Sequence, residues 1–240
     1  MKNTNKLLIL GIRGIPAEHG GFETFAEKLA LYLTSKGWDV TVYCQESLTN
    51  FTNVFQSDWK GVNRVHIPVK GSGAKATIIF DYLSVKHALK QSGVVLTLGY
   101  NTALFNLWFR LKGKKNLINM DGIEWKRQKW GVIAKLWVWL NERFGCWFGN
   151  YLIADHPSIA DHLATRTRRS KITMIPYGGR EIFEADEKIL ARYNLVMGNY
   201  AILIARPEPE NSILEVVETF SNKSRGAKLV LLGEYLPELN

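Results

Sequence analysis

The sequence predicts an α/β protein built on a doubly wound parallel sheet. Short apolar segments typical of buried strands alternate along the chain with longer segments that carry apolar residues at helical spacing. The first apolar segment leads into a glycine-containing loop and then into a helical pattern. This order places a backbone loop in front of a helix N-terminus, where an anion is favoured. The carboxyl ends of the strands should therefore form one rim that binds ligands.

Seven segments in the first 178 residues have the pattern of strands. They are residues 7–12, 38–44, 64–69, 94–98, 116–120, 151–154 and 171–175. Helices are predicted where apolar residues recur every three or four positions. These segments are residues 22–35, 78–90, 102–111 and 131–148, with a further helix that has Pro157 near its start. The polar segment before residue 64 predicts a loop.

The remaining chain predicts a connector and the beginning of a second unit. We expect one domain over residues 1–178, a connector with a short helix over 179–197, and a new unit over 198–240. The new unit has strand patterns at 201–205 and 228–232 and a helical pattern at 212–220. Two strands and one helix bury too little surface to be stable alone. They either extend the first sheet or open a second domain.

Composition narrows the functional class. The 240 residues are 46% hydrophobic, enough for a substantial core, but no apolar run approaches the roughly 20 residues that span a bilayer. A signal-peptide pattern is lacking, and Cys44 and Cys146 have apolar neighbours, which predicts reduced core thiols in a cytoplasmic protein. The formal charge of +9 suits nucleic acid, anionic lipid or phosphorylated substrates. No nucleic-acid-binding motif accompanies that charge, so no nucleic-acid partner is expected.

The loop before the first helix is the strongest candidate for a binding element. Gly20 and Gly21 precede the helix, and glycine permits positive φ and a close approach of the backbone to a ligand. The spacing differs from the G-x-G-x-x-G fingerprint of dinucleotide-binding proteins. A turn that only reverses the chain is the structural alternative. His19, in the same loop, is a further candidate.

Several stretches, in order along the chain, resemble the N-terminal domain of bacterial family 4 glycosyltransferases, in the branch with rhamnosyltransferases of surface-polysaccharide assembly. They are Gly11-Ile-Arg-Gly-Ile-Pro16, Gly20-Gly-Phe-Glu-Thr24, Asp121-Gly-Ile-Glu-Trp-Lys-Arg127, Ala154-Asp-His-Pro-Ser-Ile-Ala160, Ile175-Pro-Tyr-Gly178 and Arg206-Pro-Glu-Pro-Glu-Asn211. The resemblance implies a GT-B fold of two facing Rossmann-like domains. It implies retaining transfer of a sugar, with rhamnose as the expected sugar, from a nucleotide-diphosphate donor to a lipid-linked or polysaccharide acceptor. Neither a metal nor a cofactor is implied.

The resemblance also assigns residues that bind substrate. Gly20 and Gly21 would contact the donor diphosphate or the acceptor, and Gly178 would lie at the donor. Arg206 matches an arginine that holds donor phosphate, a role suited to its forked donors. Asn211 stands where a lysine often assists, and it brings an amide without charge. The family's later glutamate-rich donor motif is absent from these residues, so the resemblance implies that the 240-residue chain alone is incomplete.

Three further candidates follow strands of the predicted sheet. Asp121 and Glu124 are the candidate catalytic residues, because a carboxylate at the rim could receive a proton from a sugar hydroxyl or orient an acceptor. Asp121 could instead cap the following turn, and Glu124 could pair with a nearby cation. His156 follows a strand and could bind substrate or only pack as a polar side chain. No cluster has metal-ligand spacing.

Residues 110–149 combine nine basic residues, three acidic residues and five of the eight tryptophans. Tryptophan with lysine or arginine is typical of the membrane interface. The segment therefore predicts an anionic membrane surface as partner, with Trp125, Trp130 and Trp139 as candidate anchors and Lys126, Arg127 and Lys129 as candidate cations. Alternatively, Trp137 and Trp147 pack into the core while the cations are solvated.

Two other functions remain alternatives. An NAD-type Rossmann oxidoreductase would use the same sheet, but the glycine fingerprint is missing and Glu46 lies further along than the usual acidic residue. A non-catalytic module that docks on membranes would account for the charge and the tryptophans without any chemistry.

Overall fold

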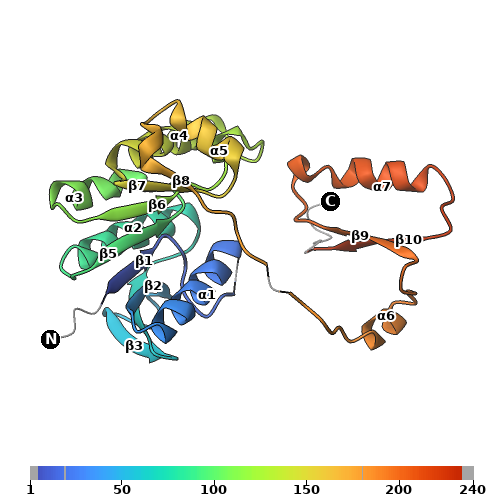
Figure 1. Ribbon diagram of the computed structural model, residues 1–240, viewed down its shortest axis with the longest axis horizontal. Helices are drawn as coiled ribbons and strands as arrows, with labels where there is room; N and C mark the ends of the chain where they lie inside the picture. The colour runs from blue at the N-terminus through green and yellow to red at the C-terminus, as the bar shows by residue number, and fades with distance from the viewer. Residues whose placement is uncertain (1–4, 19, 180, 234–240) are drawn as a thin grey trace. The chain divides into compact units, whose positions relative to one another are not determined.

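The structure is a computed structural model that describes residues 5–18, 20–179 and 181–233. The chain divides into two compact units (Figure 1). Unit 1 comprises residues 1–125 and 132–177, and unit 2 comprises residues 126–131 and 178–240. Among the described residues, none of the helices combines the length and the apolar character needed to cross a membrane.

Unit 1 contains an eight-stranded sheet in the order β3-β4-β2-β1-β5-β6-β7-β8. Seven strands are parallel, which confirms the predicted α/β fold class. They are β1 (Lys6–Leu10), β2 (Asp39–Ser47), β4 (Val62–Val69), β5 (Val94–Leu98), β6 (Asn116–Asn119), β7 (Tyr151–Ala154) and β8 (Ile172–Met174). The chain starts at the centre and moves first to one edge and then, through β5, to the other, which makes the sheet doubly wound.

The prediction of a loop before residue 64 is wrong in part, because residues 55–59 form the strand β3 (Phe55–Trp59). This edge strand is antiparallel to β4. Its residues alternate between half-buried and exposed, so polar side chains on the outer face obscure the strand pattern. Lys60 and Gly61 form the turn to β4 with φ of 53° and 81°, the conformation that a tight hairpin requires.

Helices cover both faces of the sheet. They are α1 (Gly21–Ser35), α2 (Gly73–Ala88), α3 (Asn106–Leu111), α4 (Val132–Phe148) and α5 (Pro157–Ala164). Alternate residues of β1 divide the core: Leu7 and Ile9 pack with α1, whereas Leu8 and Leu10 pack with α2 and α3. The register continues the second face through β6 and β7, whose buried residues pack with α4 and α5. Thus α1 covers one face, and α2 to α5 cover the other.

Unit 2 forms a sheet of its own and does not extend the first. Its strands β9 (Tyr200–Ile204) and β10 (Lys228–Leu232) are parallel, and α7 (Ile213–Ser221) connects them. The short helix α6 (Lys188–Arg192) precedes them, in the segment where a short helix was expected. The strand–helix–strand order repeats the building block of unit 1.

Candidate functional site: the carboxyl rim of the sheet

The loops that follow β1, β5, β6, β7 and β8 leave the sheet at the same edge, because these strands are parallel neighbours. Asp121 and Glu124 follow β6, and His156 follows β7. The sheet therefore brings these three predicted residues to one rim. Gly20 and Gly21 belong to the same rim through the loop between β1 and α1.

Asp121 has the backbone conformation of a special position. Its φ is 48°, in the left-handed region that residues with a side chain seldom adopt. Its N–H donates to Oδ1 of Asn119, the last residue of β6, at 3.2 Å. The half-buried Asp121 is thus held by an amide that the sheet itself positions. Strain of this kind concentrates at functional sites, which makes Asp121 the leading candidate among the rim residues.

Tyr100 holds the loop that carries Glu124. Its hydroxyl donates to the carbonyl of Gly122 at 3.0 Å and accepts from the N–H of Glu124 at 2.8 Å. The side chain of Tyr100 is buried, and that burial raises its pKa, so the hydroxyl stays a neutral donor. Trp125 anchors the loop further by donating its indole N–H to the buried Glu142 on α4 at 2.8 Å. The loop that carries both predicted carboxylates is therefore fixed at two points.

Tyr177 joins three elements of the rim. Its hydroxyl accepts from Nδ2 of Asn119 at 3.0 Å, and its ring meets that of Phe25 on α1 edge to face at 5.5 Å. Burial raises the pKa of Tyr177 to about 12; the hydrogen bond from Asn119 opposes this rise, and the nearby charges of Asp121 and Asp155 add to it. Sequence analysis assigned no site role to Tyr177, although it lies one residue before the predicted Gly178. Its polar contacts place a neutral hydroxyl beside the candidate carboxylate.

The loop before α1 corrects the expectation for its glycines. Gly20 has φ of −177°, and neither Gly20 nor Gly21 has positive φ. A Cβ at either residue would meet open space, so packing inside this chain does not require glycine there. The steric requirement lies instead at Gly11, with φ of +85°, where a Cβ would lie 2.2 Å from the carbonyl oxygen of Leu98. Open space beside Gly20 and Gly21 agrees with an approaching ligand. His19 lies outside the described residues.

The contacts that the structure describes for His156 are structural. It is the N-cap of α5, and its Nδ1 accepts from the N–H of Ser158 at 3.1 Å. Pro157 occupies the first turn, where it needs no backbone partner. The imidazole is exposed at the rim. Its capping role fixes the position of the ring without placing it in a catalytic pair.

The remaining predicted residues, Gly178, Arg206 and Asn211, belong to unit 2. Gly178 is exposed and has open space where a Cβ would be. Arg206 is exposed just beyond β9, at the carboxyl edge of the second sheet. Nδ2 of Asn211 donates to the carbonyl of Arg206 at 2.8 Å, and the N–H of Glu208 donates to the same carbonyl at 2.7 Å. Asn211 therefore shapes the loop that presents Arg206.

A polar cavity of about 410 Å³ opens in unit 1, near the ends of β1, β2 and β4. His66 is one of its lining residues: Nδ1 lies 2.7 Å from Glu46, Nε2 lies 2.7 Å from the hydroxyl of Ser57, and the ring stacks on Phe55. Residues that line the cavity include Arg13, Gly14, Glu18, Glu23, Gln45, Glu46, Arg64, His66 and Thr77. Sequence analysis assigned no site role to this network, because its members lie on different strands.

Carboxylates, guanidinium groups and amides around one cavity can hydrogen-bond a ligand with many hydroxyl groups. Arg64 helps to hold the wall, since it donates to the carbonyl of Ile15 at 3.2 Å and to the hydroxyl of Ser57 at 3.1 Å. Burial raises the pKa of the Cys44 thiol to about 11, so this lining residue is not a nucleophile at neutral pH. In the part of the chain that the structure describes, no cluster of side chains has the composition of a metal site.

The fold is that of a two-unit α/β protein, and the loops after the parallel strands of unit 1 form one rim. The chain belongs to the family described as "Domain of unknown function (DUF1972)", whose model matches residues 4–180. No curated protein sequence matches the chain.

Solved structures with the same fold cover nearly the whole chain. UDP-N-acetylglucosamine 2-epimerase from Rickettsia bellii is 11% identical with a TM-score of 0.58, and the match covers 98% of this chain and 63% of that one. A structure described as trehalose-6-phosphate from E. coli bound with UDP-2-fluoro glucose is 9% identical with a TM-score of 0.65, covering 98% and 66%. UGT2 of Phytolacca americana, complexed with UDP-2-fluoro-glucose and pterostilbene, is 9% identical with a TM-score of 0.53, covering 98% and 72%. At these identities the likeness establishes the fold, and the chain spans less than two thirds of the Rickettsia protein.

Proposed function

We propose that the protein is a glycosyltransferase of the GT-B type that takes a sugar from a nucleotide-diphosphate donor. The observation that carries this proposal is the fold match over 98% of the chain to structures that hold UDP-2-fluoro-glucose. The matched stretches of sequence resemble glycosyltransferases independently of the fold. Together they favour sugar transfer over the NAD-type oxidoreductase, which lacks its glycine fingerprint.

In this proposal each unit has its own substrate. Unit 1 binds the acceptor at the rim, where Asp121 receives a proton from, or orients, the attacking hydroxyl. Arg206 of unit 2 holds the donor phosphates with charge-assisted hydrogen bonds. The acceptor side is supported by the polar cavity around His66, whose donors and acceptors suit a carbohydrate. Neither a metal nor a cofactor is part of the proposal.

The finer assignment follows the resemblance in sequence. We propose rhamnose as the transferred sugar, retention of its anomeric configuration, and a lipid-linked or polysaccharide acceptor in surface-glycan assembly. A lipid-linked acceptor keeps its sugar at the bilayer surface. The protein would therefore work as a peripheral protein on the inner face of the cell membrane.

A second candidate is epimerisation of a UDP-sugar, because UDP-N-acetylglucosamine 2-epimerases share the fold at similar TM-scores. The two reactions differ in their products. An epimerase converts the nucleotide sugar without any acceptor, whereas a transferase releases the nucleotide diphosphate as it forms a glycosidic bond.

Ligand titration followed by product analysis tests the proposal. Intrinsic fluorescence would be recorded while UDP-glucose, UDP-N-acetylglucosamine, dTDP-rhamnose or NAD is added to the protein. We expect saturable binding of a nucleotide sugar and none of NAD. Incubation with that sugar and a lipid-linked acceptor should then release nucleotide diphosphate only when the acceptor is present. Binding of NAD alone, or a changed sugar without acceptor, would reject the transferase.

A further inference from the structure

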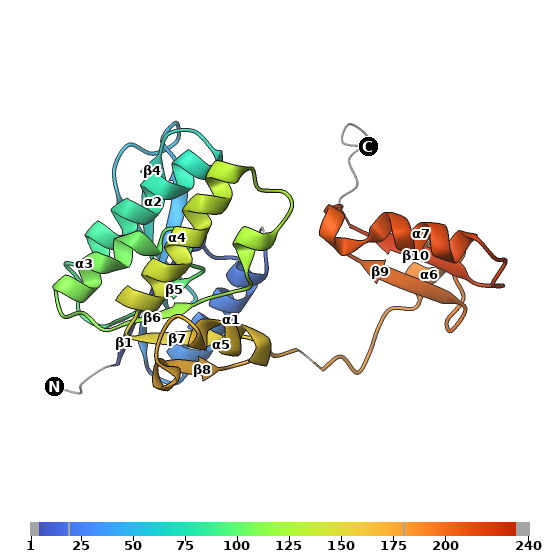
Figure 2. The ribbon, with the colours of Figure 1, turned by 90° about the horizontal axis from the view of Figure 1, so that it is seen from above.

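The helices α2, α3 and α4 form a continuous layer on one face of unit 1 (Figure 2). Within these helices the sequence holds two carboxylates, Asp81 and Glu142, and both are buried. The described contacts of Glu142 include the indole of Trp125 at 2.8 Å and Nε2 of His162 at 3.0 Å, both inside the unit. The outer surface of the three helices therefore presents no carboxylate. We refer to it as the helical face.

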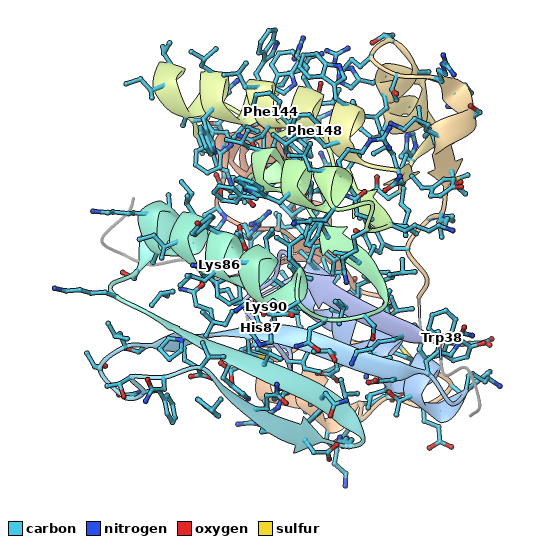
Figure 3. All side chains as sticks on the ribbon, turned by 90° about the vertical axis from the view of Figure 1, so that its left-hand side faces the viewer. Trp38, Lys86, His87, Lys90, Phe144 and Phe148 are labelled. Carbon is cyan, nitrogen blue, oxygen red and sulfur yellow. The ribbon has the colours of Figure 1, made fainter. Side chains whose placement is uncertain are left out.

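The charged residues at the surface of the helical face are lysines and arginines. Lys75 and Lys86 are exposed on α2. The exposed Lys90 follows at the end of the helix, and Lys86 and Lys90 are labelled in Figure 3. Arg110 is exposed on α3, and α4 contributes the half-buried Lys135 and Arg143. Elsewhere in unit 1 the helices carry exposed or half-buried acids, such as Glu27 on α1 and Asp161 on α5. The helical face therefore has cations without an exposed carboxylate, unlike the surfaces of α1 and α5.

The same face also exposes a large amount of apolar surface. Val132 and Ile133, at the start of α4, have exposed fractions of 85% and 86%. The exposed apolar residues of the three helices are Ile79, Tyr82, Trp108, Leu111, Val132, Ile133, Leu136, Leu140 and Trp147. Apolar residues mixed with lysine and arginine on one face of a helix are the pattern of interfacial helices. A large exposed apolar patch on a folded unit marks an interaction surface.

The aromatic residues on this face differ from those predicted as anchors. Trp125, Trp130 and Trp139 are half-buried, and the guanidinium of Arg143 covers the ring of Trp139 at 3.3 Å. Trp147, predicted as a core residue in the structural alternative, is instead exposed. Trp108 is exposed as well, and indole side chains prefer the boundary between headgroups and acyl chains.

A basic cavity of about 540 Å³ borders the helical face where α3 and α4 end. Its charged lining residues are Arg110, Arg168 and Lys171, and Trp147 forms part of its wall. Nζ of Lys171 donates to the carbonyl of Cys146 at 3.0 Å, which holds its charge at the cavity. Burial lowers the pKa of Lys171, and the nearby positive charge of Arg110 lowers it as well, because two cations line the same cavity. Three cations without a carboxylate suit a phosphate group.

We propose that the helical face docks on an anionic lipid bilayer and that the basic cavity takes the phosphate of a lipid headgroup. The apolar side chains enter the interface while the cations meet anionic headgroups. This inference deepens the proposed membrane location by naming the surface and the lipid chemistry. Its argument uses neither donor nor acceptor, so vesicle binding and sugar transfer can fail independently.

Vesicle flotation tests the docking surface. We expect the protein to float with vesicles of phosphatidylcholine and phosphatidylglycerol at low salt, and to remain unbound with phosphatidylcholine alone. Each basic residue near such a surface contributes about 1 kcal/mol, so Lys86→Glu, Arg110→Glu and Lys135→Glu together should weaken partitioning roughly 100-fold or more. The matched control reverses Lys28, Lys36 and Lys60, which are exposed outside the helical face. Equal loss in both triple variants would show a general charge effect and overturn the proposal.

Three further variants test the apolar side chains and the cavity. Ile133→Ser with Leu136→Ser should reduce binding and reduce quenching of tryptophan fluorescence by brominated lipids. Arg168→Glu should weaken binding about fivefold or more, because each lost charge contributes about 1 kcal/mol. Arg169→Glu is its control, since Arg169 is the next residue, is exposed and does not line the cavity. Equal effects of Arg168→Glu and Arg169→Glu would remove the headgroup site.

Two results would overturn the docking surface as a whole. One is a wild-type protein that stays unbound with anionic vesicles at low salt. The other is a dimer in light scattering that dissociates in the Ile133→Ser, Leu136→Ser variant while vesicles capture nothing. That second result would assign the helical face to a second copy of the chain.

Discussion

At the scale of single residues, two residues of the rim are of interest. Asp121 has a left-handed backbone conformation that is costly for a residue with a side chain, and Tyr177 contributes a neutral hydroxyl group. Asp121 keeps φ of 48° because the amide of Asn119 holds its N–H, and the same Asn119 donates to Tyr177. One asparagine at the end of β6 thus positions both groups.

We expect Asp121→Asn to reduce turnover at least about tenfold while leaving stability nearly unchanged. Asparagine tolerates the left-handed conformation, so the variant removes the charge and the basic oxygen without straining the loop. The measurements are kcat with the donor found by titration and the thermal midpoint. Asp161→Asn, at an exposed carboxylate of α5, is the control. A lower midpoint with normal turnover would give Asp121 a structural role instead.

A second residue-scale prediction concerns pH. Asp81 is buried on α2, where its Oδ2 accepts from the hydroxyl of Thr102 at 2.8 Å. Burial raises its pKa to about 7 against the weaker, opposite effect of that hydrogen bond. Between pH 4 and 7 the folded chain therefore binds more protons at Asp81 than the unfolded chain, and the contribution of Asp81 to stability falls as the pH rises through this range.

Asp81→Asn should remove this contribution, because the amide stays neutral at every pH. Urea unfolding at pH 4.5 and 7.5 would show the free energy of unfolding of the wild type falling relative to that of the variant. The expected fall in the free energy of unfolding between these two pH values, relative to the variant, is on the order of 2–4 kcal/mol. Parallel pH dependence in the two proteins would show that Asp81 ionises normally.

At the scale of elements, the sequence predicts those strands and helices whose apolar residues form a continuous local pattern. The parallel strands are buried on both faces, so each is a short apolar run that a sequence pattern detects. β3 was not predicted because its residues alternate between half-buried and exposed. The predicted start of α2 was late, because the helix begins at Gly73, before its apolar pattern starts at Ile78. Such boundaries depend on tertiary packing rather than on local composition.

The cavity around His66 was missed for a related reason. Register pairs His66 of β4 with Cys44 of β2 and with Phe55 of β3, which brings Glu46 and Ser57 within hydrogen-bond distance. These residues are 20 and 9 positions away from His66, and no short motif connects them. By contrast, the position of Asp121 and Glu124 in the loop after β6 could be predicted, because both lie within five residues of the strand end, and their catalytic role stays a prediction.

The loop between β1 and α1 gives a prediction at this scale. Gly11→Ala should destabilise unit 1 by about 2–4 kcal/mol, because its Cβ would lie 2.2 Å from the carbonyl oxygen of Leu98. Gly21→Ala meets open space at the first residue of α1 and should leave stability nearly unchanged. Chemical denaturation of both variants checks the difference.

Ligand binding by the same two variants then separates structure from function. If the space beside Gly21 receives a substrate, Gly21→Ala should weaken its binding in the stable protein. Normal binding and turnover in Gly21→Ala would leave this glycine pair with no part in the site.

At the scale of the whole molecule, the two units repeat one arrangement, in which a parallel strand is followed by a loop and a helix. In unit 1 the loop after β1 leads into α1, and in unit 2 the loop after β9 leads through the 3₁₀-helix η4 (Pro209–Asn211) into α7. The side chain of Asn211 and the N–H of Glu208 both bond the carbonyl of Arg206. The backbone of this loop is consequently fixed before any ligand binds, while Arg206 is exposed at its start.

Arg206→Ala should therefore impair use of the donor far more than use of the acceptor. Loss of a charge-assisted hydrogen bond to phosphate costs about 1.5–3 kcal/mol, which corresponds to roughly a 10- to 150-fold fall in kcat/KM for the donor. Arg206→Lys should give an intermediate loss, because lysine keeps the charge without the forked geometry.

Lys223→Ala, at another exposed cation of unit 2, is the matched control and should leave the kinetics unchanged. Steady-state kinetics with each substrate varied in turn would measure these effects. Unchanged donor KM and kcat in Arg206→Ala would exclude the arginine from the site and would leave unit 2 without its predicted contact to phosphate.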